Sequence, residues 1–205
     1  MDLYKNTETI LLTGVPGAGK GTLANALTSK NSNYFHYSSG EAIRQHYQEK
    51  GEMYNKYFKD LQPGEFIDDA QLEEMTTHWF SERPETQELR EDPKNRIILI
   101  DGSPRTINQV PYFLEHFNVT HMVELYLNKE GSLIRQGRRP GRGNENFEKK
   151  YADDQRLTQP MRDYIRKENI IPYNIIPAEE LTAATFTDRP LREIIAMFEL
   201  VTKPL

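Results

Sequence analysis

The chain has 205 residues, the length of one globular domain, of which 37% are hydrophobic and 28% charged. Its 26 basic and 31 acidic residues give a net charge of -5, which argues against general binding to nucleic acid. No apolar run approaches the roughly 20 residues of a membrane-spanning helix, so we expect no membrane partner. There is no cysteine, which excludes disulfides and thiolate metal sites. Because the N-terminus has no cleavable signal pattern, we expect a cytoplasmic protein with a single domain over residues 1–205.

Short apolar runs alternate along the chain with longer amphipathic stretches, which is typical of an α/β protein with a mainly parallel sheet. The predicted strands cover residues 8–13, 34–37, 96–101, 121–127 and 170–176. The predicted helices cover residues 20–29, 40–50, 53–60, 69–81, 106–116, 129–136, 147–168 and 190–201. The continuous Ile, Leu and Val content of the strands indicates that the sheet is buried on both faces.

The first predicted strand leads into a glycine-rich loop, Gly14-Val15-Pro16-Gly17-Ala18-Gly19-Lys20-Gly21-Thr22, and then into a predicted helix. Glycine lets such a loop turn several backbone N–H groups inward, and the positive end of the helix dipole points to the same place. Lys20 adds a mobile cation for outer phosphates, and Thr22 adds a hydroxyl that can face Mg²⁺. This segment therefore predicts a polyphosphate-binding loop, a variant in which Gly21 stands where the strict pattern has Ser or Thr.

A second candidate segment, Asp101-Gly102-Ser103-Pro104-Arg105, follows another buried strand. Ligands of α/β sheets gather at the carboxyl ends of the strands, so we expect this segment to converge with the glycine-rich loop. Asp101 can help to hold hydrated Mg²⁺, and the guanidinium of Arg105 can fork onto a phosphate. A turn-capping Asp and a solvated Arg would explain the segment by itself, but the neighbouring loop favours the binding role.

The third candidate segment, Ser38-Ser39-Gly40-Glu41-Ala42-Ile43-Arg44, is typical of a helix start, with an acidic residue in the first turn. A capped surface helix would explain it without any ligand, so its weight comes from the other two segments. Basic residues also gather where Pro140, Gly141 and Gly143 interrupt regular structure: Arg135, Arg138, Arg139, Arg142, Lys149 and Lys150.

Together these segments resemble the adenylate kinases and their nucleoside monophosphate kinase relatives, in order along nearly the whole chain. The matching segments are 14–22, 38–44, 64–69, 101–109, the arginine-rich stretch near 138, and 188–190. The resemblance implies a P-loop NTPase-type parallel sheet flanked by helices, a helical acceptor-binding insert over 38–69 that extends to about 80, and a short lid over about 137–147. Without cysteines or a Cys/His cluster, we expect no structural zinc in this lid.

The resemblance also implies the roles of individual residues. The donor ATP would be bound by Gly17, Ala18, Gly19, Lys20, Gly21, Thr22, Arg138 and, beside its adenine, Arg189. The acceptor would be bound by Ser39, Arg44, Glu65, Phe66, Ile67, Gly102, Ser103, Pro104, Arg105 and Gln109, with Arg139, Arg142 and Lys150 near its phosphate. Thr22 and Asp101 would hold the Mg²⁺ of Mg-ATP through water. Lys20, Arg105 and Arg138 would be the catalytic residues.

Two positions bear on the acceptor base. Within the family, a hydroxyl where Ser39 stands and a Gln where Gln109 stands accompany adenine, whereas Ala and Asn accompany UMP and CMP. A carboxamide can pair its donor and its acceptor with the adenine edge. The expected reaction is therefore ATP plus AMP to two ADP, by Mg-assisted in-line transfer. It needs no catalytic base, because the acceptor phosphate is already ionised near neutral pH.

Two alternatives stay open at this point. One is a kinase that acts on UMP or CMP. The other is a nucleotide-binding regulatory protein with weak kinase activity, which the short lid and Lys150 favour because a lysine cannot fork onto a phosphate as an arginine does. We expect a monomer whose partners are small nucleotides.

Overall fold

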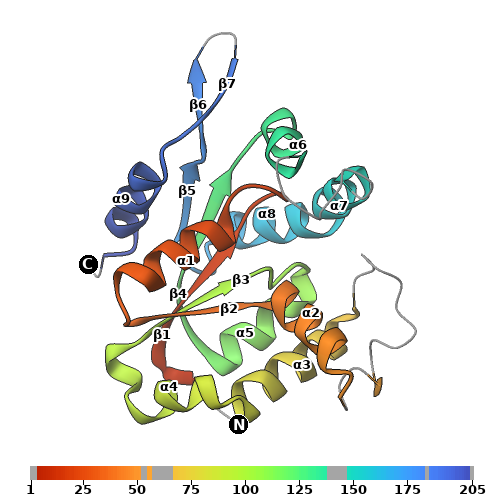
Figure 1. Ribbon diagram of the computed structural model, residues 1–205, viewed down its shortest axis with the longest axis vertical. Coiled ribbons are helices and arrows are strands. Elements are labelled where there is room, and N and C mark those ends of the chain that lie inside the picture. The colour runs from red at the N-terminus through yellow and green to blue at the C-terminus, as the bar shows by residue number, and fades with distance from the viewer. Residues whose placement is uncertain (1–3, 52–54, 57–66, 138–146, 183–184, 204–205) are drawn as a thin grey trace.

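The computed structural model describes residues 4–51, 55–56, 67–137, 147–182 and 185–203. These residues form a five-stranded parallel sheet in the order β2-β3-β1-β4-β5, together with a small antiparallel hairpin (Figure 1). The strands of the sheet are β1 (Tyr4–Thr13), β2 (Tyr34–Ser38), β3 (Ile97–Asp101), β4 (Phe117–Tyr126) and β5 (Tyr173–Pro177). The hairpin pairs β6 (Glu179–Thr182) with β7 (Thr185–Asp188). The predicted α/β fold with a parallel sheet is therefore confirmed.

Helices flank this sheet. They are α1 (Lys20–Lys30), α2 (Ser39–Glu49), α3 (Asp69–Glu82), α4 (Gln87–Glu91), α5 (Val110–His116), α6 (Lys129–Gly137), α7 (Phe147–Asp153), α8 (Gln159–Glu168) and α9 (Leu191–Val201). The start of α3 is fixed by a capping box, in which Asp68 and Gln71 each bind the other's backbone N–H. None of the helices in the described part of the chain has the length and apolar character needed to cross a membrane.

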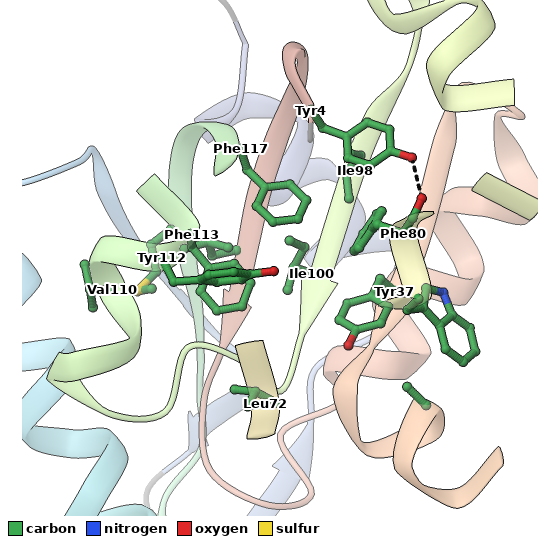
Figure 2. Packing of buried hydrophobic residues seen from close by; sticks show 14 of the residues in the cluster. Tyr4, Tyr37, Leu72, Phe80, Ile98, Ile100, Val110, Tyr112, Phe113 and Phe117 are labelled. Carbon is green, nitrogen blue, oxygen red and sulfur yellow. Dashed lines mark hydrogen bonds between the residues drawn. The ribbon is translucent and has the colours of Figure 1, made fainter. Parts of the chain in front are cut away.

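Both faces of the sheet are buried because alternate residues of its central strands point to opposite sides. Ile98 and Ile100 of β3 pack into one core with α3, α5 and α8, whereas Leu99 packs into a second core with α1 and α9. Figure 2 shows part of the first core, where the hydroxyl of Tyr4 donates to the backbone oxygen of Phe80 over 2.9 Å. The two cores hold the strands firmly, so the loops at their carboxyl ends stand on a rigid base.

The long helix predicted over 147–168 is divided in the structure. It consists of α7, a π-helical turn over Asp154–Thr158, and α8. Pro160 lies in the first turn of α8 and has no N–H to donate to the preceding turn. A local change of helical register accommodates that missing hydrogen bond, and such π-helical turns are frequent at functional sites.

Other elements differ from the sequence-based expectation at their ends. β4 begins at Phe117 rather than at 121, because β1 extends to Tyr4, which pairs with Phe117. The register between β1 and β4 shifts twice, between Tyr4 and Glu8 and between Thr9 and Ile10. The predicted strand 170–176 is β5 over Tyr173–Pro177, and the predicted helix 106–116 opens with a 3-10 turn over Ile107–Gln109. The sequence analysis missed α4 and the β6–β7 hairpin. The predicted helix 53–60 lies outside the described residues, apart from residues 55–56.

Candidate active site

The carboxyl ends of three neighbouring strands meet where the candidate segments begin. In the parallel ladders, Asp101 at the end of β3 lies opposite Leu12 of β1 and opposite Ser38 of β2. Thr13 of β1 lies opposite Glu124 of β4 on the other side. The sheet register therefore brings the glycine-rich loop, the segment after β3 and the start of α2 to one edge, as the sequence predicts.

The glycine-rich loop takes a backbone path that requires its glycines. Gly14 has φ +134°, and a Cβ there would lie 2.4 Å from the backbone oxygen of Leu125. Gly19 has φ +99° and caps the N-terminus of α1 in a left-handed conformation. These conformations are disfavoured for residues with a side chain. The loop consequently passes close against β4 and leads directly to the positive end of the α1 dipole.

Lys20 is folded back over this loop. Its ammonium group donates to the backbone oxygens of Gly14 at 2.7 Å and Val15 at 3.3 Å. Burial lowers the pKa of Lys20, and the carboxylates of Asp101 and Asp154 oppose that effect. Among the described residues, the hydrogen-bond acceptors of this ammonium group are loop carbonyls, and it can exchange them for the oxygens of a bound phosphate, which are stronger acceptors because they are charged.

On the other side of Asp101, the structure brings Ser39, Gly102 and Arg105 together. Arg105 Nε donates to the backbone oxygen of Gly102 at 2.6 Å, and Gly102 has φ +88°. A Cβ on Gly102 would lie 2.7 Å from the hydroxyl of Ser39, which is 2% exposed at the start of α2. Burial lowers the pKa of Arg105, and Asp101 and Asp154 oppose it. Since arginine stays protonated in proteins, this is a partly dehydrated cation suited to an anion.

Arg44 lies near this group but is exposed. Its guanidinium binds Glu41 in the first turn of α2, and it would lie 3.5 Å from a Cβ placed on Gly40. Ser103 is 3% exposed and precedes a cis peptide bond to Pro104.

Gln109 is buried rather than solvent-facing, with 3% of its surface exposed. Its amide oxygen accepts the backbone N–H of Arg105 at 2.6 Å, and its amide nitrogen donates to Asp69 at 2.7 Å. The side chain thus joins the segment after β3 to the start of α3, a pairing that the sequence analysis did not foresee.

The oxygen ligands that Mg²⁺ prefers are present at the start of α1. A Cβ on Gly21 would lie 3.7 Å from Asp101 Oδ2, so the Asp101 carboxylate reaches the first turn of the helix that carries Thr22. The described residues contain no cluster of three or more His, Cys, Asp or Glu side chains that could hold a metal by themselves. This donor set fits an Mg²⁺ ion that arrives with a nucleotide and keeps most of its water.

A buried ionic group at the end of β4 was missed by the sequence analysis. Arg162 is 1% exposed and forks onto Asp154 over 3.2 and 2.8 Å, and its Nε lies 3.5 Å from Glu124. Tyr173 of β5 donates its hydroxyl to Glu124 at 2.6 Å. With Val15 of the glycine-rich loop, Arg162 and Glu124 line a cavity of about 280 Å³. No motif marks this group, because its members come from β4, β5, the π-helical turn and α8.

Arg135 of α6 is a second residue that was missed. Its guanidinium donates to the backbone oxygens of Ala18 in the glycine-rich loop, at 3.1 Å, and of Ala178 just after β5. The backbone N–H of Arg189 donates to the same Ala178 oxygen at 3.2 Å. Arg135 and Arg189 therefore converge beside the glycine-rich loop. The sequence signal that could have identified Arg135 was the group of closely spaced arginines that begins with it.

The remaining candidates are only partly described. Five of them lie outside the described residues: Glu65, Phe66, Arg138, Arg139 and Arg142. Ile67 is half-buried and packs against the first core, and Lys150 is half-buried on α7.

A parallel sheet whose first strand leads through this glycine-rich loop into a helix defines a P-loop nucleotide-binding protein. Residues 13–149 match the AAA domain family AAA_17, and the chain belongs to that family. It is also similar to the uridylate kinase of Schizosaccharomyces pombe, with 26% identity over 87% of this chain and 93% of that enzyme.

Adenylate kinases match as well. The enzyme of Leifsonia xyli subsp. xyli is 27% identical over 79% of this chain and 82% of its own length. The enzyme of Mesomycoplasma hyopneumoniae is 25% identical over 66% of this chain, and the match spans 59% of that enzyme. The resemblance found in the sequence is confirmed: the chain is a distant homologue of the nucleoside monophosphate kinases, the class of enzyme that transfers a phosphoryl group to a nucleoside monophosphate.

Proposed function

We propose that the protein transfers the γ-phosphoryl group of ATP to AMP and produces two ADP. The observation that carries this proposal is the convergence of Lys20 on one side of Asp101 with Ser39, Gly102 and Arg105 on the other. The glycine-rich loop and Lys20 suit the donor polyphosphate, whereas Arg105 suits the acceptor phosphate. Two phosphate groups bound on these two sides would approach each other at the end of β3.

Phosphoryl transfer spreads negative charge over the moving group, so catalysis consists mainly of positioning and electrostatic stabilisation. Lys20 would follow the outer phosphates of ATP, and Arg105 would turn its donors from Gly102 to the acceptor phosphate. Asp101 and Thr22 would hold the water shell of Mg²⁺, which supplies charge neutralisation when it is bound with ATP. We propose that Arg138 in the lid approaches the moving group and that lid closure excludes water.

The test is a coupled measurement of ADP formation with ATP, Mg²⁺ and each of AMP, UMP, CMP and GMP in turn. We expect AMP to give the highest kcat/KM, because Ser39 and Gln109 accompany adenine in the related kinases. Faster turnover of UMP or CMP would instead favour a pyrimidine nucleotide kinase. The similarity to a uridylate kinase along 93% of that enzyme's length makes this the second candidate.

Binding of ATP and AMP without turnover would instead favour a regulatory role. Titration calorimetry with each nucleotide, under the same conditions as the assay, distinguishes this outcome from a protein that binds neither.

A further inference from the structure

The buried amide of Gln109 has a fixed orientation. Its oxygen must face the backbone N–H of Arg105, 2.6 Å away, because a backbone N–H can only donate. Its NH₂ group therefore faces Asp69, whose Oδ1 accepts from it at 2.7 Å. One amide N–H remains, since the described residues provide a single acceptor for this nitrogen. Gln109 thus has a donor left for a ligand, whereas its oxygen is already engaged.

Asp69 supplies the missing acceptor. It is the first residue of α3, is half-buried, and receives hydrogen bonds from Gln109 and, at 3.0 Å, from the hydroxyl of Thr106, both at Oδ1. Within the described residues, its Oδ2 accepts no hydrogen bond. An ionised carboxylate can only accept hydrogen bonds, so Oδ2 is an acceptor that a ligand can use.

The hydrogen-bonded unit of Asp69 and Gln109 therefore presents one donor and one acceptor. Adenine offers the complement, an accepting ring nitrogen N1 beside a donating 6-amino group, and cytosine offers the same order at N3 and its 4-amino group. Hypoxanthine, guanine and uracil reverse it, with a ring N–H beside a carbonyl oxygen. A carboxylate cannot turn to donate, so a reversed edge would leave the Asp69 carboxylate and the Gln109 NH₂ group unmatched once the base covers them.

We propose that Asp69 determines base specificity and restricts the acceptor to nucleotides whose base carries an amino group next to an accepting ring nitrogen. This inference rests on the proposed function in placing the acceptor base beside Gln109. That placement is consistent with the structure, because Arg105, the proposed acceptor-phosphate residue, is bonded directly to Gln109 through its backbone.

The test compares AMP with IMP, which differ only at this edge of the purine, and CMP with UMP. Binding to the full-length protein is measured by titration calorimetry, and turnover with ATP and Mg²⁺ by ADP formation. We expect AMP to bind roughly 10²-fold more tightly than IMP, and CMP more tightly than UMP. Equal affinity of the wild-type protein for AMP and IMP would overturn the proposal.

Asp69→Asn isolates the role of the carboxylate. An asparagine can present either its oxygen or its NH₂ group, so we expect the AMP-to-IMP affinity ratio to fall at least tenfold, chiefly through better IMP binding. Glu73→Gln is the matched control, because it removes the same charge one turn further along α3 and should leave the ratio unchanged. An unchanged ratio in Asp69→Asn, or an equal fall in Glu73→Gln, would contradict the proposal.

Asp69→Glu keeps the carboxylate and should still prefer AMP, which guards against an asparagine variant that does not fold. The two proposals fail separately. If ADP forms from no monophosphate while AMP still binds more tightly than IMP, the kinase proposal fails and the base specificity stands. If ADP forms from AMP and IMP at equal efficiency, the kinase proposal stands and the role of Asp69 is refuted.

Discussion

Lys20 is the residue whose contacts predict the clearest change in rate. Within the described structure its ammonium group donates only to loop carbonyls, and the residue is half-buried. We expect Lys20→Ala to lower kcat by about 10²- to 10³-fold, as does the loss of one preorganised donor elsewhere. Stability should change little, because the loop path depends on glycines. Initial rates of ADP formation and urea unfolding measure the two effects.

Lys30→Ala is the matched control for this variant. Lys30 ends the same helix and forms an exposed ion pair with Glu199, 2.5 Å away, so its removal should leave kcat unchanged. A folded Lys20→Ala protein with the wild-type rate would remove the glycine-rich loop from the proposed mechanism.

At the scale of single residues, the sequence was sufficient where one short segment carries a whole feature. Asp101 ends a predicted strand, and Arg105 and Lys20 lie in the segments that follow two predicted strands. The rule for parallel sheets therefore places the three residues together. It was insufficient where a hydrogen bond joins distant segments. The pairing of Gln109 with Asp69 spans 40 positions and depends on how α3 packs against the segment after β3. No periodicity or spacing encodes such an orientation.

At the scale of elements, the central strands β1 and β3 were predictable because each contains a continuous run of branched apolar residues, whereas β2 is a short aromatic segment. The β6–β7 hairpin was not, since Glu179 and Glu180 do not favour strands and the pairing of two short segments creates the hairpin. The break in the helix over 147–168 was also missed. Pro160 was the available signal, but a proline in the first turn of a helix is equally compatible with a new helix start.

The contact between α2 and α3 contains a histidine that favours its neutral form. His46 is 3% exposed, and its ring packs edge-on against Trp79. Burial lowers the pKa of His46; the neighbouring charge of Arg83 and the ring of His78 also lower it, and Glu49 opposes them. The folded state therefore binds a proton on His46 less readily than the unfolded chain does.

This difference predicts how stability depends on pH. The contribution of neutral His46 is fully present above the ordinary histidine pKa of about 6.5, and it is lost as the pH falls below that value. We expect the wild-type free energy of unfolding to decrease between pH 7.5 and 5.5, and His46→Phe to reduce that decrease by removing the titration. Urea unfolding at several pH values measures both proteins.

His121→Phe is the comparison for this experiment, because it removes an imidazole from β4 instead. Parallel stability curves for the wild-type and His46→Phe proteins would show that His46 does not contribute. The same conclusion would follow if His121→Phe reduced the decrease equally.

At the scale of the whole molecule, α8 is attached to the sheet by charge as well as by apolar packing. Met161 and Ile165 of α8 belong to the first core. Between them, Arg162 extends to Asp154 and to Glu124 of β4, to which Tyr173 of β5 also binds. Burial lowers the pKa of Arg162, but its acidic partners outweigh that effect and raise the pKa above its usual value. The guanidinium thus contacts and helps to compensate two buried carboxylates.

Removal of Arg162 tests this attachment. Arg162→Met keeps an apolar stem of similar length but removes the guanidinium that contacts the buried carboxylates of Asp154 and Glu124, so we expect a loss of about 3–5 kcal/mol in the free energy of unfolding. Adding Asp154→Asn should recover part of that loss, because one of the two carboxylates that lost its partner is then neutral.

Arg166→Met is the control one turn further along α8. Its pair with Asp163 is about half exposed, so the change should stay within about 1 kcal/mol. Urea unfolding at pH 7.5 measures all four proteins, and equal losses in the Arg162 and Arg166 variants would show that the buried group contributes no more than an ordinary surface ion pair.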